Sequence, residues 1–399
     1  MLMGLMNTYL FPEHYQIEIG NILNLFSKAG ILVRSVGLIG WVNNKPVYDL
    51  FIDRVIGDDE FRKIYVELVE KHKYFPLQPM GSEPIVRLIP IKDSPRRTKF
   101  VALILAITTV LTVSLTGYGL ALGFHELLYR DIMGLEVDNY EIMVSMISFT
   151  SLFLLTLMSH ELGHLYVSKK SGMIVSGPFL IPAPPIQLGF IGTLGAVINM
   201  KTLPPTKRDL ARLGLSGPLI GFLISLIVGL IGFYLSPLIP LSYFEKPEIA
   251  GKTGSVGIVP LTLLLIYFMR STPGYASLMH PLLFCSYIIM LVTFLNLIPI
   301  GQLDGGHVVR AYVSADKHSK LGLVIPYIMF STGLILMYIK GFSQASAYYI
   351  SLSLILAIFY AIFGRRKHPG AANHYSSRVN PIYLVLYLIL IVLTLPIPT

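Results

Sequence analysis

The sequence is poor in cysteine and in charge. It has one cysteine in 399 residues, so no disulfide can form within the chain, and cysteine usage says nothing about the redox compartment. Charged residues make up 13% of the chain and hydrophobic residues 54%, whereas soluble domains carry about 25% charge. These proportions exclude an ordinary soluble enzyme and a disordered chain, and they indicate a protein that crosses a membrane several times.

The few charges are also unequal in sign. Lys and Arg number 31 against 22 Asp and Glu, which gives a net charge of +9. In a membrane protein such an excess first reflects orientation in the lipid bilayer, so we predict no nucleic-acid partner.

The chain divides into a charged N-terminal part and an apolar remainder. Residues 1–99 predict a small soluble α+β domain, whose regulator the sequence does not name, and residues 100–399 predict a membrane domain. Within the first part, residues 58–71 predict a helix, because apolar residues recur at helical spacing and acids cluster in the first turn. Short β-rich runs flank this helix at residues 31–36, 46–52 and 85–91.

The remainder predicts a polytopic α-helical membrane protein with about seven transmembrane helices. The expected spans are residues 100–124, 143–167, 213–237, 281–300, 321–339, 345–363 and 382–395. Residues 256–269 are also apolar, but Pro260 interrupts them and Arg270 ends them. We therefore expect that segment to be interfacial or re-entrant.

The orientation is predicted from the basic residues between the spans. With the N-terminus in the cytoplasm, the cytoplasmic connections, including a basic hinge at residues 92–99, hold 17 Lys and Arg, against 5 outside. A full span at residues 256–269 would put the basic cluster 365–367 outside. The positive-inside rule therefore predicts a multi-pass protein, in the cell membrane, with a cytoplasmic N-terminus and an external C-terminus.

The pentad His160-Glu161-Leu162-Gly163-His164 is the first candidate for chemistry. Residues four apart share one face of a helix, so both imidazoles can reach a single Zn²⁺ ion, and Glu161 can address a metal-bound water without being a ligand. A structural pair of helix-end histidines is the alternative, but ionisable groups within a span are expensive and mark functional sites. The similar stretch at His125 has no second histidine and predicts no site.

A third ligand is expected at the end of the fourth predicted span. There, the run from Asn296 to His307 contains Pro299, Gly301 and Asp304. Pro299 and Gly301 break the helix and let the chain turn Asp304 towards the histidines. His307 is a rival third ligand, and a capping role for Asp304 is the structural alternative.

Together the pentad and the N-x-x-P-x-x-x-L-D-G-G run resemble the site-2 protease family of intramembrane zinc metalloproteases. The resemblance covers residues 140–320. It implies that His160, His164 and Asp304 bind one zinc ion, that Glu161 is the catalytic base, and that Asn296 contacts the substrate or the oxyanion. It also implies hydrolysis of peptide bonds in or near the transmembrane segments of single-span membrane proteins. The N-terminal domain and the seventh span are similar to the longer archaeal and plastid-type members.

Two segments between the motifs are of interest. Residues 189–199 predict a strand or hairpin beside the site, in which Gly192, Thr193, Leu194 and Gly195 could hold an unwound substrate by strand pairing. A plain loop is the alternative. The run Ser216-Gly217-Pro218 favours close helix packing over a functional turn.

Two other functions fit part of the pattern. A metal-ion transporter also places His and Asp in a membrane, but it needs ligands along a path through the bilayer and has no need of Glu161. A catalytically idle scaffold would leave the N-terminal domain as the working part, which the intact motifs disfavour. Replacement of Glu161 by Gln separates these functions, because it removes a catalytic base while leaving metal binding and transport intact.

Overall fold

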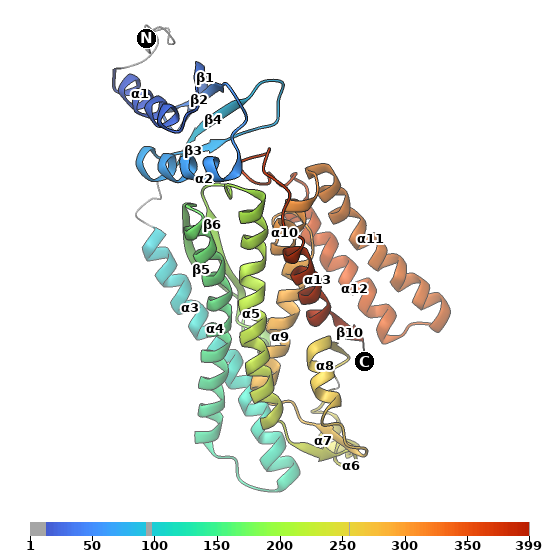
Figure 1. The fold of residues 1–399 in the computed structure, drawn as a ribbon. Helices are drawn as coiled ribbons and strands as arrows, with labels where there is room; N and C mark the ends of the chain where they lie inside the picture. The colour runs from blue at the N-terminus through green and yellow to red at the C-terminus, as the bar shows by residue number, and fades with distance from the viewer. Residues whose placement is uncertain (1–12, 93–97, 255, 399) are drawn as a thin grey trace.

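The computed structural model describes residues 13–92, 98–254 and 256–398. An α+β region forms one end of the molecule and caps a bundle of long helices (Figure 1). Five of the described helices are long and apolar enough to cross a membrane, and two more apolar helices are shorter. The chain is therefore an integral, multi-pass membrane protein. The predicted basic hinge lies mostly outside the described residues.

The N-terminal α+β region is an antiparallel four-stranded sheet with two helices. Its elements are α1 (Glu13–Lys28), β1 (Val33–Val42), β2 (Lys45–Ile52), α2 (Asp58–Glu67), the short π-helix η3 (Leu68–His72), β3 (Tyr74–Leu77) and β4 (Ile85–Pro90). The strand order is β1-β2-β4-β3. Asn43 and Asn44 close the first hairpin with positive φ angles of 50° and 59°, the backbone that two-residue hairpin turns need. Sequence analysis predicted α2 and three strands but missed α1 and β3.

The N-terminal region is docked on the membrane part by buried polar contacts. Arg62 of α2 forms an ion pair with Asp209, which is 1% exposed. The Tyr65 hydroxyl donates a 2.8 Å hydrogen bond to the Leu203 carbonyl, and burial raises the pKa of this hydroxyl. Gln78 forms a β-bridge with Asn373 near the other end of the chain. Segments far apart in sequence therefore meet above the bundle.

The expected spans appear as helices. The long ones are α3 (Thr98–His125, extended by the π-helix η4, Glu126–Met133), α4 (Asn139–Lys170), α5 (Lys207–Leu235), α11 (Ala315–Lys340) and α12 (Gln344–Phe359, extended by the π-helix η6, Tyr360–Gly364). The shorter ones are α9 (Pro281–Leu297) and α13 (Ile382–Thr394). Connections hold β7 (Leu238–Pro240), α6 (Leu241–Phe244), α7 (Pro247–Ala250) and β9 (Tyr275–Ser277). Helices α11 and α12 form an antiparallel pair beside the bundle (Figure 1).

The segment that was expected to be interfacial or re-entrant pairs with the residues after the last helix. Strand β8 (Ile258–Pro260) leads into α8 (Leu261–Phe268), and β10 (Pro396–Pro398) pairs with β8 antiparallel. Helix α13 supplies about 20 Å at 1.5 Å per residue, and the extended residues after it supply about 10 Å more. This sum matches a hydrocarbon core of about 30 Å. Strand pairing satisfies the backbone of the extended part.

A β-hairpin lies along α3 and along α4, the helix that carries the pentad. Strand β5 (Val175–Pro182) pairs antiparallel with β6 (Thr193–Met200), and the short 3-10 turn η5 (Ile186–Leu188) lies between them. Thr112 of α3 donates a 2.6 Å hydrogen bond to the Gly192 carbonyl, and Thr116 accepts one from the Ile186 amide. Side chains of α3 thus satisfy the turn of the hairpin, and the prediction of a strand or hairpin here is confirmed.

The break after α9 is built from proline and glycine. Helix α9 ends at Leu297, and α10 (Asp304–Tyr312) begins seven residues later. Gly301 has a positive φ of 54°, and a Cβ atom there would collide with the Phe363 carbonyl. Cβ atoms at Gly305 and Gly306 would collide with the carbonyls of Leu297 and Gly301. The glycines therefore allow α10 to start tightly against this turn, with Asp304 as its first residue.

Candidate metal centre

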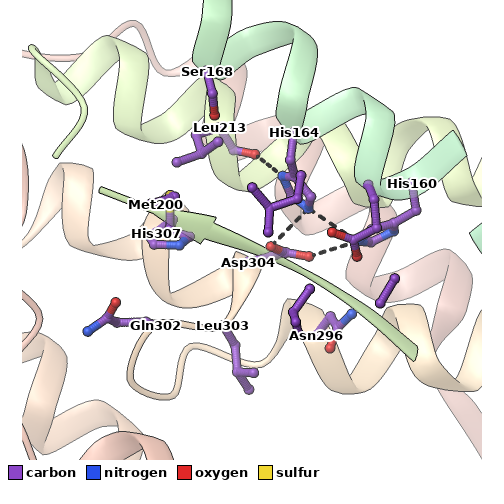
Figure 2. Close-up of a pocket in the computed structure, with 14 residues that line it drawn as sticks. His160, His164, Ser168, Met200, Leu213, Asn296, Gln302, Leu303, Asp304 and His307 are labelled. Carbon is purple, nitrogen blue, oxygen red and sulfur yellow. Dashed lines mark hydrogen bonds and ion pairs between the residues drawn. The ribbon is translucent and has the colours of Figure 1, made fainter. Parts of the chain in front are cut away.

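Three side chains from two helices converge at one site near the C-terminal end of α4. His160 and His164 lie one turn apart on α4, and Asp304 begins α10. The Asp304 carboxylate lies 3.2 Å from Nε2 of each histidine, and the two Nε2 atoms are also 3.2 Å apart (Figure 2). Among the described residues, these three are the one group of His, Cys, Asp and Glu whose ligand atoms all lie within 4.8 Å of one another. The structure thus brings together the three ligands that the sequence predicted.

A backbone carbonyl determines the tautomer of His164. Its Nδ1 lies 2.8 Å from the Leu213 carbonyl oxygen, which can only accept, so Nδ1 donates. The neutral ring then turns a lone pair on Nε2 towards the Asp304 carboxylate, which is itself an acceptor. Acceptors that face one another need a cation between them. Two imidazole nitrogens and one carboxylate are also a ligand set that zinc uses in catalytic sites, with one position left open.

Glycines bring α5 close to the metal centre. Cβ atoms at Gly214 and Gly217 would collide with the Asp304 carbonyl and the His164 ring, and one at Gly221 would lie 3.0 Å from His160. From the α4 side, Gly163 approaches the Ser216 carbonyl in the same way, at 2.7 Å. Helix α5 thus forms a wall against both histidines, and the predicted close packing at Ser216-Gly217-Pro218 is confirmed.

The metal ligands line a cavity of about 180 Å³, together with residues of α9 and β6. Glu161, which is 7% exposed, and Asn296 line it as well. Figure 2 shows Asn296 across the cavity from the histidines, with β6 passing between them. Two further residues with sequence-assigned roles therefore share the space that the ligands face.

The four residues predicted for the substrate strand lie farther along β6. The cavity is lined instead by Ala196, Val197, Ile198 and Met200. Thr193 turns its hydroxyl back to the Ile181 carbonyl of β5, at 2.7 Å. Leu194 is 68% exposed. Among the strands that the structure describes, β6 pairs with β5 alone, so its other edge is open.

His307, the rival ligand, is engaged elsewhere. Its Nδ1 lies 2.8 Å from Nε2 of His368, which in turn accepts a 2.9 Å hydrogen bond from the Gly370 amide at its Nδ1. Burial, followed by the neighbouring His307, His318 and Arg310, lowers the pKa of His368 to about 2. Sequence analysis missed His368 because it follows a basic cluster in a segment without periodicity.

The second pentad-like stretch has no part in the centre. His125 lies 2.8 Å from the Ser145 hydroxyl and 3.5 Å from Glu141, at the other end of α3 and α4. The structure agrees with the prediction that this stretch forms no metal site.

The same combination of residues is found in known proteins. The family "Peptidase family M50" matches residues 148–339, which include the pentad, Asn296 and Asp304. The chain is similar to peptidase family M50 over these 192 of its 399 residues. This is the family of the site-2 proteases that the two motifs resemble, and its metal group here is His160, His164 and Asp304.

Several proteins similar to this chain carry zinc in their names. Over 177 residues, 43% of this chain, it is 30% identical to the probable zinc metalloprotease EGY2, chloroplastic, of Arabidopsis thaliana. Over 184 residues, 46% of this chain, it is 28% identical to the zinc metalloprotease MJ0392 of Methanocaldococcus jannaschii. The matches span 29% and 39% of those proteins. The solved site-2 protease from Methanocaldococcus jannaschii aligns with a TM-score of 0.27 at 21% identity, over 67% of this chain and 89% of that one.

Proposed function

We propose that this protein is an intramembrane zinc endopeptidase, which cleaves single-span membrane proteins in or near their transmembrane segments. One observation carries the proposal: His160, His164 and Asp304 converge in one cavity that Glu161 also lines, within a bundle of apolar helices. A transporter would need ligands at several depths, whereas the described residues hold one such group.

The chain's own residues divide the work of hydrolysis. His160, His164 and Asp304 would hold a zinc ion, which when bound would supply Lewis acidity and lower the pKa of water enough for it to lose a proton near neutral pH. Glu161 takes that proton as general base and later returns it to the leaving amine. Asn296, on the opposite side of the cavity, donates a hydrogen bond to the carbonyl oxygen as negative charge develops there. Helix α5 excludes water from the far side of the histidines.

The open edge of β6 suits the substrate that this chemistry requires. A transmembrane helix hides its carbonyls, so it must unwind, and each unpaired backbone group in lipid costs several kcal/mol. Pairing with β6 would satisfy the freed groups. We therefore expect cleavage close to the cytoplasmic face, favoured by Gly, Pro or Asn near that end of the substrate. The charge asymmetry supports a cytoplasmic N-terminal region.

Replacement of Glu161 by Gln tests the proposal. Purified wild-type protein should cleave a defined single-span test substrate with a helix-breaking Gly-Pro pair. Glu161→Gln protein should keep about one zinc per chain and lose at least 100-fold in rate, as expected when a general base is removed. In cells, single-span stubs should accumulate in membranes that hold the variant, and membrane proteomics measures them. Full activity in Glu161→Gln, or cleavage by neither protein, would refute the function.

A further inference from the structure

His307 has no part in the proposed chemistry, yet it lies at a junction of two cavities. It lines the catalytic cavity and also a second cavity of about 260 Å³. Met200, at the end of β6, lines both as well. Phe75 of the N-terminal region and Leu203 also line the second cavity. A peptide that follows β6 from the metal centre towards the N-terminal region therefore passes His307.

The hydrogen bonds of this cluster determine where its protons lie. The Gly370 amide can only donate, so Nδ1 of His368 carries a lone pair and the ring's hydrogen is on Nε2. That Nε2–H lies 2.8 Å from Nδ1 of His307. Nδ1 of His307 therefore accepts, and the hydrogen of the neutral His307 ring is on its own Nε2.

The Nε2–H group of His307 has no hydrogen-bond partner among the described residues. Some polar side-chain atoms of the described residues are both buried from solvent and without a partner, as Nε2 of His318 is. Nε2 of His307 is not one of these, so part of its surface is accessible. The residue as a whole is 5% exposed. The small exposed part thus opens on the cavities that the ring lines, where it presents a fixed donor.

We propose that Nε2–H of His307 donates a hydrogen bond to a main-chain carbonyl of the bound peptide, on the side of the cleaved bond nearer the N-terminal region. His368 is the positioning residue that holds His307 in the donating tautomer. The proposal rests on the proposed peptidase function. It suits an enzyme whose substrates share a backbone rather than a sequence, because an unwound peptide brings carbonyls that have lost their partners.

The support for His368 extends to the N-terminal region. The His368 carbonyl accepts a 3.2 Å hydrogen bond from Arg310 of α10. Four residues on, the Ala372 carbonyl accepts from the Gln78 amide at 2.9 Å. The N-terminal region thus holds the segment that sets the His307 proton.

Paired substitutions in the zinc-loaded full chain test the donor. His307→Leu removes it, whereas the amide of His307→Gln replaces Nε2–H. With the single-span test substrate, His307→Leu should raise KM about five- to tenfold, the effect of one hydrogen bond, with a smaller change in kcat. His307→Gln should stay within about twofold of wild type. In a Glu161→Gln background, the same ratios should appear in the Kd of this substrate, measured by fluorescence anisotropy.

His368 is tested by a second pair and by spectroscopy. His368→Leu should raise KM like His307→Leu, and His368→Gln, whose amide can still donate to His307, should restore it; a purely structural role would not give this order. Nitrogen-15 NMR of labelled histidines should place the hydrogen of both rings on Nε2. A hydrogen on Nδ1 of His307, or an unchanged KM in His307→Leu, would overturn the donor even in an active enzyme. Failure of the wild-type chain to bind and cleave would instead refute the peptidase function.

Discussion

At the scale of single residues, backbone groups determine which histidine nitrogens are free. The Leu213 carbonyl takes the Nδ1 hydrogen of His164 and leaves Nε2 for a metal. The Gly370 amide does the reverse to His368. Histidine is thus a metal ligand at position 164 and a hydrogen-bond donor to His307 at position 368. The difference arises because the fold supplies an acceptor to the first ring and a donor to the second.

The ligand set predicts the zinc content of variants. Asp304→Ala should lose most of its zinc, because two imidazoles remain where three protein ligands are needed. His307→Ala should keep about one zinc per chain, since its Nδ1 is already bonded to His368. Elemental analysis of the purified variants measures this. Zinc retained in Asp304→Ala and lost in His307→Ala would make His307 the third ligand.

The lowered pKa of His368 predicts a loss of stability in acid. A histidine that is neutral when folded takes up a proton when unfolded, so its stabilising contribution is full above about pH 6.5 and falls as the pH drops towards the folded pKa of about 2. At pH 5 the loss is about 2 kcal/mol. His368→Gln cannot titrate, so its unfolding midpoint should fall less between pH 7 and pH 5 than that of wild type. Equal falls in both proteins would contradict the assignment.

At the scale of elements, close approach of helices gives the site its shape. Helix α5 presents glycines to both metal-binding histidines, and the turn before α10 needs glycine to place Asp304. Larger residues at these places would separate the three ligands. The geometry of the metal centre therefore depends on residues that have no chemistry of their own.

Gly217→Ala should disturb the metal centre without touching a ligand. Its Cβ would collide with the His164 ring, and overpacking of this kind costs about 1–3 kcal/mol. We expect a lower unfolding midpoint and less bound zinc. Gly123→Ala on α3 is the control, because a Cβ there meets no atom within 4 Å and changes helix stability by about 1 kcal/mol or less. Equal behaviour of the two variants would remove the argument from packing.

Proline on β6 tests the substrate strand. Consecutive residues of a strand point their amides to opposite edges, so of Ala196→Pro and Val197→Pro, one removes a donor to β5 and the other a donor on the open edge. The variant that loses the donor on the open edge should still fold and bind zinc, but it should cleave at least tenfold more slowly. Cleavage that both variants leave unchanged would show that β6 does not pair with substrate.

The sequence predicted the spans and the ligand set because both depend on local patterns. Apolar runs mark helices, and His160, His164 and Asp304 lie in short motifs. Contacts between distant segments leave no such pattern: Gln78 bonds to Asn373 across 295 residues, and His307 to His368 across 61. The part of β6 that lines the cavity also could not be chosen, because a strand pattern does not reveal which of its residues meet a cavity.

At the scale of the whole molecule, the N-terminal region and the bundle form one body above the metal centre. Buried Asp209 at the start of α5 binds Arg62, and the Gln78–Asn373 bridge ties the other side. The second cavity, beside the metal centre, is accordingly lined both by Phe75 of the N-terminal region and by residues 368–370.

The charge asymmetry predicts the orientation of this body. A cysteine placed at Thr399 should react with a membrane-impermeant maleimide added to intact cells, whereas one placed at Lys63 should not. The native Cys285 is fully buried and adds little background. The opposite labelling pattern would mean that the N-terminal region faces outside, and protection at both positions would mean that residues 256–269 span the membrane.

The pairing of β8 with β10 also dictates an order of events during synthesis. The Leu261 amide at the start of α8 donates a hydrogen bond to the Leu395 carbonyl. The Thr262 hydroxyl donates one to the Leu393 carbonyl, 131 residues later in the chain. At about 5–20 residues per second, the ribosome needs on the order of ten seconds to make that partner. Until then, the first turn of α8 enters the bundle with unsatisfied backbone groups. The pairing of β8 can therefore form only after residues 396–398 have been made, and until then the insertion machinery must shield this segment.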